Sequence, residues 1–169
     1  GSTETVWRDL LEKEGGRYRP PTLVMFSGAT RSACGSARAA MGPFYCPNDQ
    51  TVYLDLSFWQ QMETQLGASG ADFARAYVIA HEFGHHVQTL TGASQKVQEA
   101  QQRAGGQEEA NQYSVALELQ ADCYAGVWAA NASAVSSGAV AVESGDLEEG
   151  MKTANAIGDD TLQKRGGGR

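Results

Sequence analysis

The segment His81-Glu82-Phe83-Gly84-His85 predicts both the centre of the fold and its chemistry. It lies in a run typical of a helix, where residues four apart share one face. The imidazoles of His81 and His85 should therefore converge, and two neutral rings make half of a tetrahedral zinc site. Glu82 follows the first ring directly, which places its carboxylate to act on a water held by such a metal. Because a motif this short also arises by chance, it needs support from a third ligand.

The remaining histidine, His86, is not expected to supply that ligand. It follows His85 by one residue and is rotated by about 100° around the helix, away from the converging rings. We expect His86 to pack or to form a capping hydrogen bond on the neighbouring face. The third ligand must then be a carboxylate or a cysteine.

The segment Glu118-Leu-Gln-Ala-Asp122 is the best source of that carboxylate. Glu118 and Asp122 lie four apart in a second helical run, so they share one face. We assign Glu118 as the metal ligand and Asp122 as the acceptor of a ligating histidine's N–H, a contact that fixes the tautomer of the ring. Small residues on the two helices would permit the close approach that such short ligands require, namely Ala80, Gly84, Ser114, Ala121, Ala125 and Ala129.

Two alternatives to this ligand set remain open. Glu118 and Asp122 could be ordinary solvated side chains, although the residues around them are mostly apolar. Cys123 could complete the site with two histidines, but it lies off the shared face. We expect Cys123 to be a small buried apolar residue.

Periodicity and turn residues predict a mostly helical α+β fold. The small antiparallel or mixed sheet should pack on the motif helix and on the helix that carries Glu118. One domain is expected over residues 1–163, followed by a disordered tail over residues 164–169. The expected strands are residues 22–26 and 51–55, with an irregular segment over residues 29–49. The expected helices are residues 3–14, 57–66, 69–91, 94–103, 107–131 and 146–157, with capping boxes at Ser57, Ser69 and Asp146.

Composition excludes several classes of partner. The 169 residues carry a net charge of −7, with no basic cluster outside the C-terminal end. This balance argues against nucleic acid and anionic membranes as partners. No apolar run is long enough to span a membrane. Gly1-Ser2 looks like the remnant of a cleaved tag, so a natural leader or anchor would have been removed with it.

Cys34 and Cys46 lie in the Gly- and Pro-rich segment and are candidates for a disulfide. Closing a loop of this length would contribute roughly 3 kcal/mol to stability. Two free thiols are the alternative. If the pair forms, the protein belongs in an oxidising compartment, outside the cytoplasm.

The sequence also resembles a known family. Residues 78–88 and 117–128, which contain the two motifs, resemble the bacterial putative neutral zinc metallopeptidases, and residues 34–36, 42–47 and 156–160 resemble further stretches of them. This family belongs with the gluzincin-type peptidases, whose third ligand is a glutamate on a later helix. The resemblance implies a zincin-like fold, one zinc ion, peptide or protein substrates, and Glu82 as general base. It also implies an N-terminal membrane anchor in the full-length protein, and a C-terminal segment with a Thr-His-Gly stretch that this sequence lacks.

Two features of the active site are less well defined by the sequence. Tyr113 and Tyr124 are candidates to stabilise the oxyanion, with a role as core or rim aromatics as the alternative. A substrate of such enzymes commonly lies extended along an exposed strand edge, for which we expect residues 51–55.

Two other functions compete with peptidase activity. A binding or scaffold module could keep zinc for stability alone, and the histidines could be core residues without a metal. Glu82 argues against the scaffold, because a structural site has no use for that carboxylate and usually closes with four protein ligands.

Overall fold

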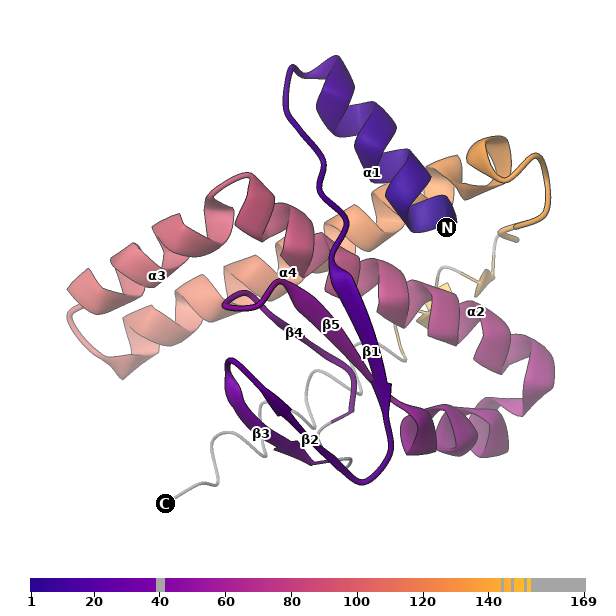
Figure 1. The fold of residues 1–169 in the computed structure, drawn as a ribbon, viewed down its shortest axis with the longest axis horizontal. Helices are drawn as coiled ribbons and strands as arrows, with labels where there is room; N and C mark the ends of the chain where they lie inside the picture. Colours follow the sequence, from indigo (N-terminus) through magenta and orange to yellow (C-terminus); the bar gives the residue numbers. More distant parts are fainter. Residues whose placement is uncertain (39–41, 144, 147, 151, 153–169) are drawn as a thin grey trace.

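The predicted strands lie side by side in one mixed sheet (Figure 1). β1 (Thr22–Phe26) pairs in parallel with β5 (Thr51–Asp55), and β4 (Phe44–Cys46) pairs antiparallel with the other side of β5. The structure is a computed structural model that describes residues 1–38, 42–143, 145, 146, 148–150 and 152. The fold is α+β and mostly helical, as the sequence predicted.

β5 is the central strand, so the prediction that residues 51–55 form an exposed edge is wrong. All five of its residues are buried. The prediction failed because β4 was not recognised. β4 has only three residues between two prolines, which is too short to show a periodic pattern. The outer strands of this sheet are β1 and β4.

The segment over residues 29–49 is also more regular than expected. β2 (Ala29–Ser32) and β3 (Gly35–Arg38) form an antiparallel hairpin beside the main sheet. Each strand has four residues, and glycine and small residues dominate their sequence. Hydrogen bonding across the hairpin, rather than local preference, therefore produces these strands.

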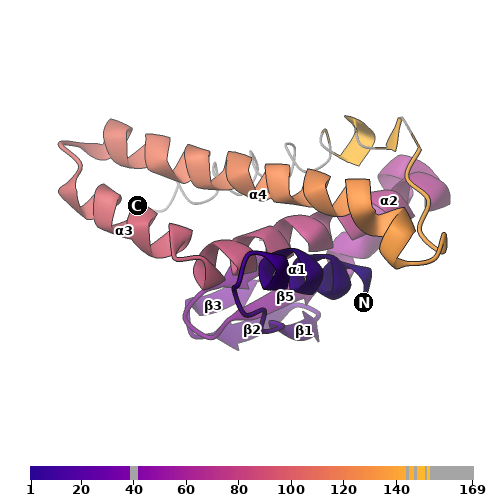
Figure 2. The ribbon, with the colours of Figure 1, turned by 90° about the horizontal axis from the view of Figure 1, so that it is seen from above.

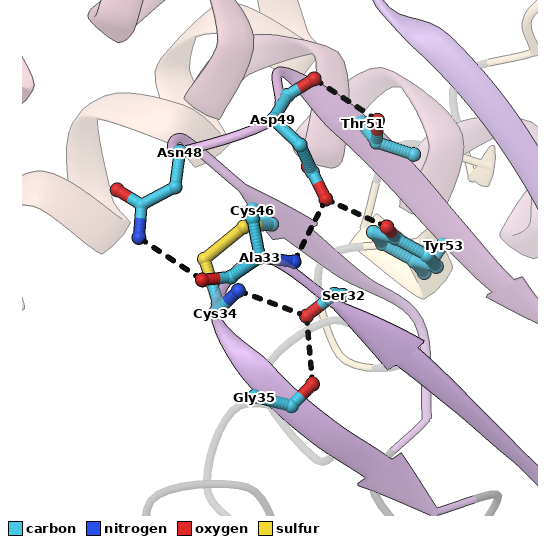
Figure 3. The surroundings of a disulfide bond; sticks show 9 residues. All are labelled: Ser32, Ala33, Cys34, Gly35, Cys46, Asn48, Asp49, Thr51 and Tyr53. Atoms are coloured by element: carbon cyan, nitrogen blue, oxygen red, sulfur yellow. Dashed lines mark hydrogen bonds between the residues drawn. A yellow bond between two sulfur atoms is a disulfide. The ribbon is translucent and has the colours of Figure 1, made fainter.

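The Cys34–Cys46 disulfide forms and ties this hairpin to β4 (Figure 3). Asp49 supports the same junction, because its Oδ2 atom accepts from the Ala33 amide at 3.0 Å and from the Tyr53 hydroxyl at 2.7 Å. The pairing of the two cysteines, with an ordinary Cα–Cα separation of 5.8 Å, confirms the expectation from the sequence.

Three predicted helices match the structure closely. α1 (Ser2–Lys13) and α3 (Ala93–Arg103) agree within a few residues, and α4 (Gln107–Val135) runs four residues further than predicted. The helix predicted over residues 146–157 lies largely outside the described residues, and the predicted tail over residues 164–169 lies wholly outside them.

α2 (Leu56–Leu90) is one helical element where the sequence predicted two. Its N-cap is Asp55, whose carboxylate accepts from the Ser57 amide at 3.0 Å, and not Ser57 as predicted. A hydrogen bond within the element shows that it is bent: Arg75 Nη2 donates to Trp59 O at 3.1 Å. Sixteen residues of straight helix would separate the two by roughly 24 Å. The chain therefore turns back between them, where the sequence predicted a break (Figure 1).

Sheet, α2 and α4 form successive layers (Figure 2). Val52 and Leu54 of β5 pack against Phe83 of α2. On the opposite side of α2, its residues join a cluster with α1 and α4 that consists of Val6, Tyr77, Ala80, Ala125, Trp128, Ala129 and Ala132. The C-terminal half of α2 therefore lies between two apolar surfaces, which fixes the helix that carries the histidine motif. No helix among the described residues is both long and apolar enough to cross a membrane.

Candidate metal centre

α2 and α4 approach closely beside the histidine motif. A Cβ atom on Gly84 would lie 3.0 Å from the carbonyl oxygen of Ala121 and 3.2 Å from Cβ of Tyr124. The neighbour at 3.0 Å is backbone, so a larger residue at position 84 would push the helices apart. The predicted close approach of small residues is confirmed at this contact. It brings the side chains of one helix within reach of the other.

The two histidines and the predicted third ligand meet across this contact. His81 Nε2 lies 3.2 Å from Glu118 Oε2, and His85 Nε2 lies 3.4 Å from Glu118 Oε1. One potential ligand atom from each of the three residues lies within 4.8 Å of the others. The three side chains that the sequence singled out are therefore close enough to bind one metal ion.

The opposite nitrogen of each ring faces a hydrogen-bond acceptor. His81 Nδ1 lies 2.8 Å from Asp122 Oδ1, and His85 Nδ1 lies 2.9 Å from Gln88 Oε1. A carboxylate and an amide oxygen only accept hydrogen bonds, so both Nδ1 atoms must carry the protons. In a neutral ring, the lone pair is then on Nε2, which faces Glu118.

These groups fit zinc. Two imidazoles and one carboxylate are a donor set of catalytic zinc sites, in which ligand bonds measure about 2.0–2.1 Å. The two oxygens of Glu118 each face one ring, at 3.2 Å from His81 Nε2 and 3.4 Å from His85 Nε2, so the carboxylate is placed to share a metal with both rings. The Glu118 side chain is 43% exposed, so this candidate ligand is accessible to solvent, whereas the two histidine side chains are each 15% exposed.

Without a metal, the same groups form an ionic network. Burial lowers the pKa of His81, but hydrogen bonds to Asp122 and Glu118 outweigh burial and raise this pKa to about 10. The pKa of His85 is also raised, because the contact with Glu118 and the charge of Glu82 outweigh the opposing effect of burial. Burial raises the pKa of Glu118, but the two rings hold it well below its usual range. A metal ion entering the site must therefore displace protons from the histidines.

The stability of the metal-free protein should fall as pH rises above 7. The pKa of His81 is about 10 in the folded protein, against 6.5 for an ordinary histidine in the unfolded chain. The contribution of His81 to the free energy of unfolding is therefore complete below pH 6.5 and is lost as pH rises through 10. The loss from this group should reach at most about 1.4 kcal/mol per pH unit, the limit for one proton. Urea unfolding in EDTA at pH 7, 8 and 9 measures it. His81→Gln is the control, and an equal pH slope in this variant would contradict the assignment.

Glu82, the predicted general base, lies on the turn of α2 between the two histidines. It is 8% exposed. Its negative charge contributes to the raised pKa of both His81 and His85. Glu82 is therefore a buried carboxylate on the same helix as two of the candidate ligands, and its role as general base stays a prediction.

His86 has the structural role expected from the sequence. It is fully buried, and its Nε2–H donates to Arg19 O at 2.6 Å while Nδ1 accepts from the Tyr45 hydroxyl at 2.9 Å. These bonds link the motif helix to β4 and to the segment before β1. The pKa of His86 is lowered by burial, so the ring is neutral at pH 7.

Three other predictions for this region have different outcomes. Cys123 is exposed, so the prediction that it is buried is wrong: it lies two residues from the buried Ala121 and Ala125 and therefore on the opposite side of α4. Tyr124 packs edge-on against Trp7 of α1, with 5.1 Å between the rings. Tyr113 lies five residues before Glu118, a rotation of about 140° around the helix, so the two do not share a face. An oxyanion role for either tyrosine stays a prediction.

Gln88 is the residue of the centre that the sequence reasoning missed. Its Nε2 atom donates to Leu117 O at 2.7 Å and to Gln120 Oε1 at 2.9 Å, while its Oε1 atom faces His85. The available signal was its spacing, because Gln88 lies three residues after His85 and therefore on a neighbouring part of the same face. A glutamine at that spacing is equally common on an exposed helix, so the spacing alone did not identify it.

Comparison with known proteins places this geometry in context. A family model described as "Putative neutral zinc metallopeptidase" matches residues 1–169. The chain is 54% identical over 168 residues to "Uncharacterized protein YpfJ" of Escherichia coli (strain K12), with 99% of this chain and 56% of the relative covered. It is 42% identical over 174 residues to "Uncharacterized protein Rv2575" of Mycobacterium tuberculosis (strain ATCC 25618 / H37Rv), with the same coverage. No solved structure gives a significant match. The chain thus spans just over half the length of these relatives.

Proposed function

The chain belongs to the putative neutral zinc metallopeptidase family, and on this premise we propose that it is a zinc-dependent endopeptidase. His81, His85 and Glu118 would hold one zinc ion, and Glu82 would act as general base. The observation that carries the proposal is the convergence of the three ligand atoms from two helices within 4.8 Å. A buried carboxylate on the next residue after the first ligand supports catalysis over a purely structural role.

The chemistry divides between the metal and the side chains. Zinc, when bound, polarises the peptide carbonyl and lowers the pKa of water to near 7. Glu82 takes a proton from the attacking water onto its carboxylate and delivers it to the nitrogen of the leaving amine. Asp122 holds the Nδ1 proton of His81 at 2.8 Å, which keeps Nε2 free as a ligand. The low exposure of Glu82, 8%, limits its exchange of protons with bulk water.

β4 is the strand that best suits an extended substrate. It is an outer strand, whereas β5 is paired on both sides. Its Tyr45 hydrogen-bonds to His86, which adjoins the ligand His85 in sequence, so β4 is tied directly to the motif helix. A substrate paired with its free edge would be recognised through main-chain atoms, which makes the enzyme tolerant of substrate sequence.

The disulfide supports an extracytoplasmic location, because such bonds persist in oxidising compartments. We propose that the full-length protein acts in the cell envelope or outside the cell, with a membrane anchor outside this chain, on peptides or proteins. The relatives are almost twice as long as the matched region, so their remaining part can contribute to substrate choice.

A quenched-peptide assay on the full-length protein tests this function. We expect hydrolysis that a chelator abolishes and that added zinc restores, because the ligands require the metal to complete the site. Chelation should also lower the melting temperature, since zinc bound only to the folded state stabilises it. Zinc-dependent melting without hydrolysis of any peptide in a diverse library would contradict peptidase activity and favour a zinc-containing scaffold.

A further inference from the structure

Gln88 is a fully buried polar side chain one turn beyond His85, and it contacts both helices that supply the candidate ligands. On α2 it faces the Nδ1 atom of His85 at 2.9 Å. On α4 it donates to the main-chain oxygen of Leu117 at 2.7 Å and to the side chain of Gln120 at 2.9 Å. Leu117 directly precedes Glu118.

The chemistry of these partners fixes the orientation of the amide. Leu117 O is a carbonyl oxygen and can only accept, so the Gln88 atom beside it must be the NH₂ group. The amide oxygen of Gln88 then faces His85, and it can only accept from the ring. The proton of a neutral His85 is therefore on Nδ1, and the lone pair of Nε2 is directed at Glu118, 3.4 Å away.

We propose that Gln88 is a positioning residue of the metal centre, which sets the tautomer of His85 and holds the Leu117–Glu118 segment of α4 against it. The inference rests on the proposed zinc site and extends it to a residue that never touches the metal. The Leu117 carbonyl fixes the orientation of the Gln88 amide. The amide oxygen then fixes which nitrogen of His85 is free to bind the metal.

The two histidines are thus held by different means. Asp122 supplies a negative charge to His81, whereas Gln88 supplies a neutral acceptor to His85. With zinc, the carboxylates of Glu118, Asp122 and Glu82 already outnumber the two positive charges of the metal. A neutral amide orients the second ring without adding a further negative charge to a buried position, where an unbalanced charge is unfavourable.

Three variants of the full-length protein test the role of Gln88. Gln88→Met keeps the length of the side chain but removes its hydrogen bonds to His85, Leu117 and Gln120. Gln88→Glu keeps an acceptor for His85 and loses the donor to Leu117. Gln120→Ala is the matched control, because it removes an exposed partner of Gln88 and leaves the contacts with His85 and Leu117 intact. Zinc affinity is measured by competition with a chromogenic chelator, and the melting temperature of each metal-free variant is measured separately.

We expect Gln88→Met to weaken zinc binding by roughly 10- to 100-fold, the usual effect of losing such an orienting contact. Gln120→Ala should change the dissociation constant by less than about threefold, as expected for one exposed hydrogen bond. Gln88→Glu should recover most of the affinity that Gln88→Met loses, although its metal-free form melts below the wild type. In zinc-loaded Gln88→Met, NMR should show faster solvent exchange of the His85 Nδ1 proton.

A purely structural role predicts that affinity falls in step with melting temperature in both Gln88 variants. That pattern, or wild-type affinity in Gln88→Met, would overturn the proposal. If Gln88→Met does not fold, the comparison of Gln88→Glu with Gln120→Ala decides: an affinity loss of 10-fold or more in Gln88→Glu would count against the acceptor role. A wild-type protein that binds no zinc would instead overturn the metal site itself, so the two failures are distinguishable.

Discussion

Replacing Glu82 with glutamine should lower kcat for peptide hydrolysis by about 10²- to 10⁴-fold, the range for loss of a general base. Glutamine has the size and shape of glutamate but cannot receive the proton. Glu82 is not among the three residues whose ligand atoms converge, so zinc content should stay near that of the wild type. Kinetic assays combined with metal analysis of the same sample measure both quantities.

The matched control for this variant is Glu99→Gln on α3. Glu99 is exposed, accepts a hydrogen bond from Gln95 of the same helix, and lies on a different helix from the motif. It should retain wild-type turnover, which separates a local loss of chemistry from a general effect of removing one negative charge. Wild-type kcat in Glu82→Gln would contradict the assignment of the base.

Glu118→Ala should weaken zinc binding by at least about 100-fold, more than the 10- to 100-fold expected for losing an orienting partner. Glu118 is the one candidate ligand from α4, and both histidines lie within 3.4 Å of its carboxylate. The helix packing should survive, because Gly84 and Ala121 remain in contact. Dialysis followed by metal analysis measures the zinc that each protein retains.

Asp122→Ala provides a graded comparison on the same face of α4. Its loss removes the acceptor of the His81 Nδ1 proton and leaves all three ligands, so its affinity should fall between those of the wild type and Glu118→Ala. Equal zinc retention by Glu118→Ala and the wild type would overturn the choice of Glu118, and a larger loss in Asp122→Ala than in Glu118→Ala would reverse the two roles.

The centre was largely predictable because helix geometry is local and regular. Spacing of four residues places His81 with His85, and Glu118 with Asp122, on single faces. Small residues allow α2 and α4 to approach closely. At Gly84 and Ala121, the two backbones leave no room for a side chain between them. The sequence also predicts that these two helices pair, because the imidazoles of His81 and His85 need a third metal ligand and Glu118 is the best candidate.

What the sequence did not reveal depends on contacts between distant segments. β4 has three residues and is a strand because β5 pairs with it, so β5 was mistaken for an edge. Gln88 differs from a surface glutamine only by its partners on α4. Cys123 was assigned to the interior by residue type, whereas the rotation of α4 exposes it. In each case tertiary packing, not local preference, decides the outcome.

Anomalous scattering recorded at the zinc absorption edge from crystals of the wild-type protein tests the central claim most directly. We predict one strong peak per chain, about 2.0–2.1 Å from the Nε2 atoms of His81 and His85 and about 2.0–2.2 Å from an oxygen of Glu118. Zinc bound elsewhere, or bound to the histidines with Glu118 turned away, would contradict it.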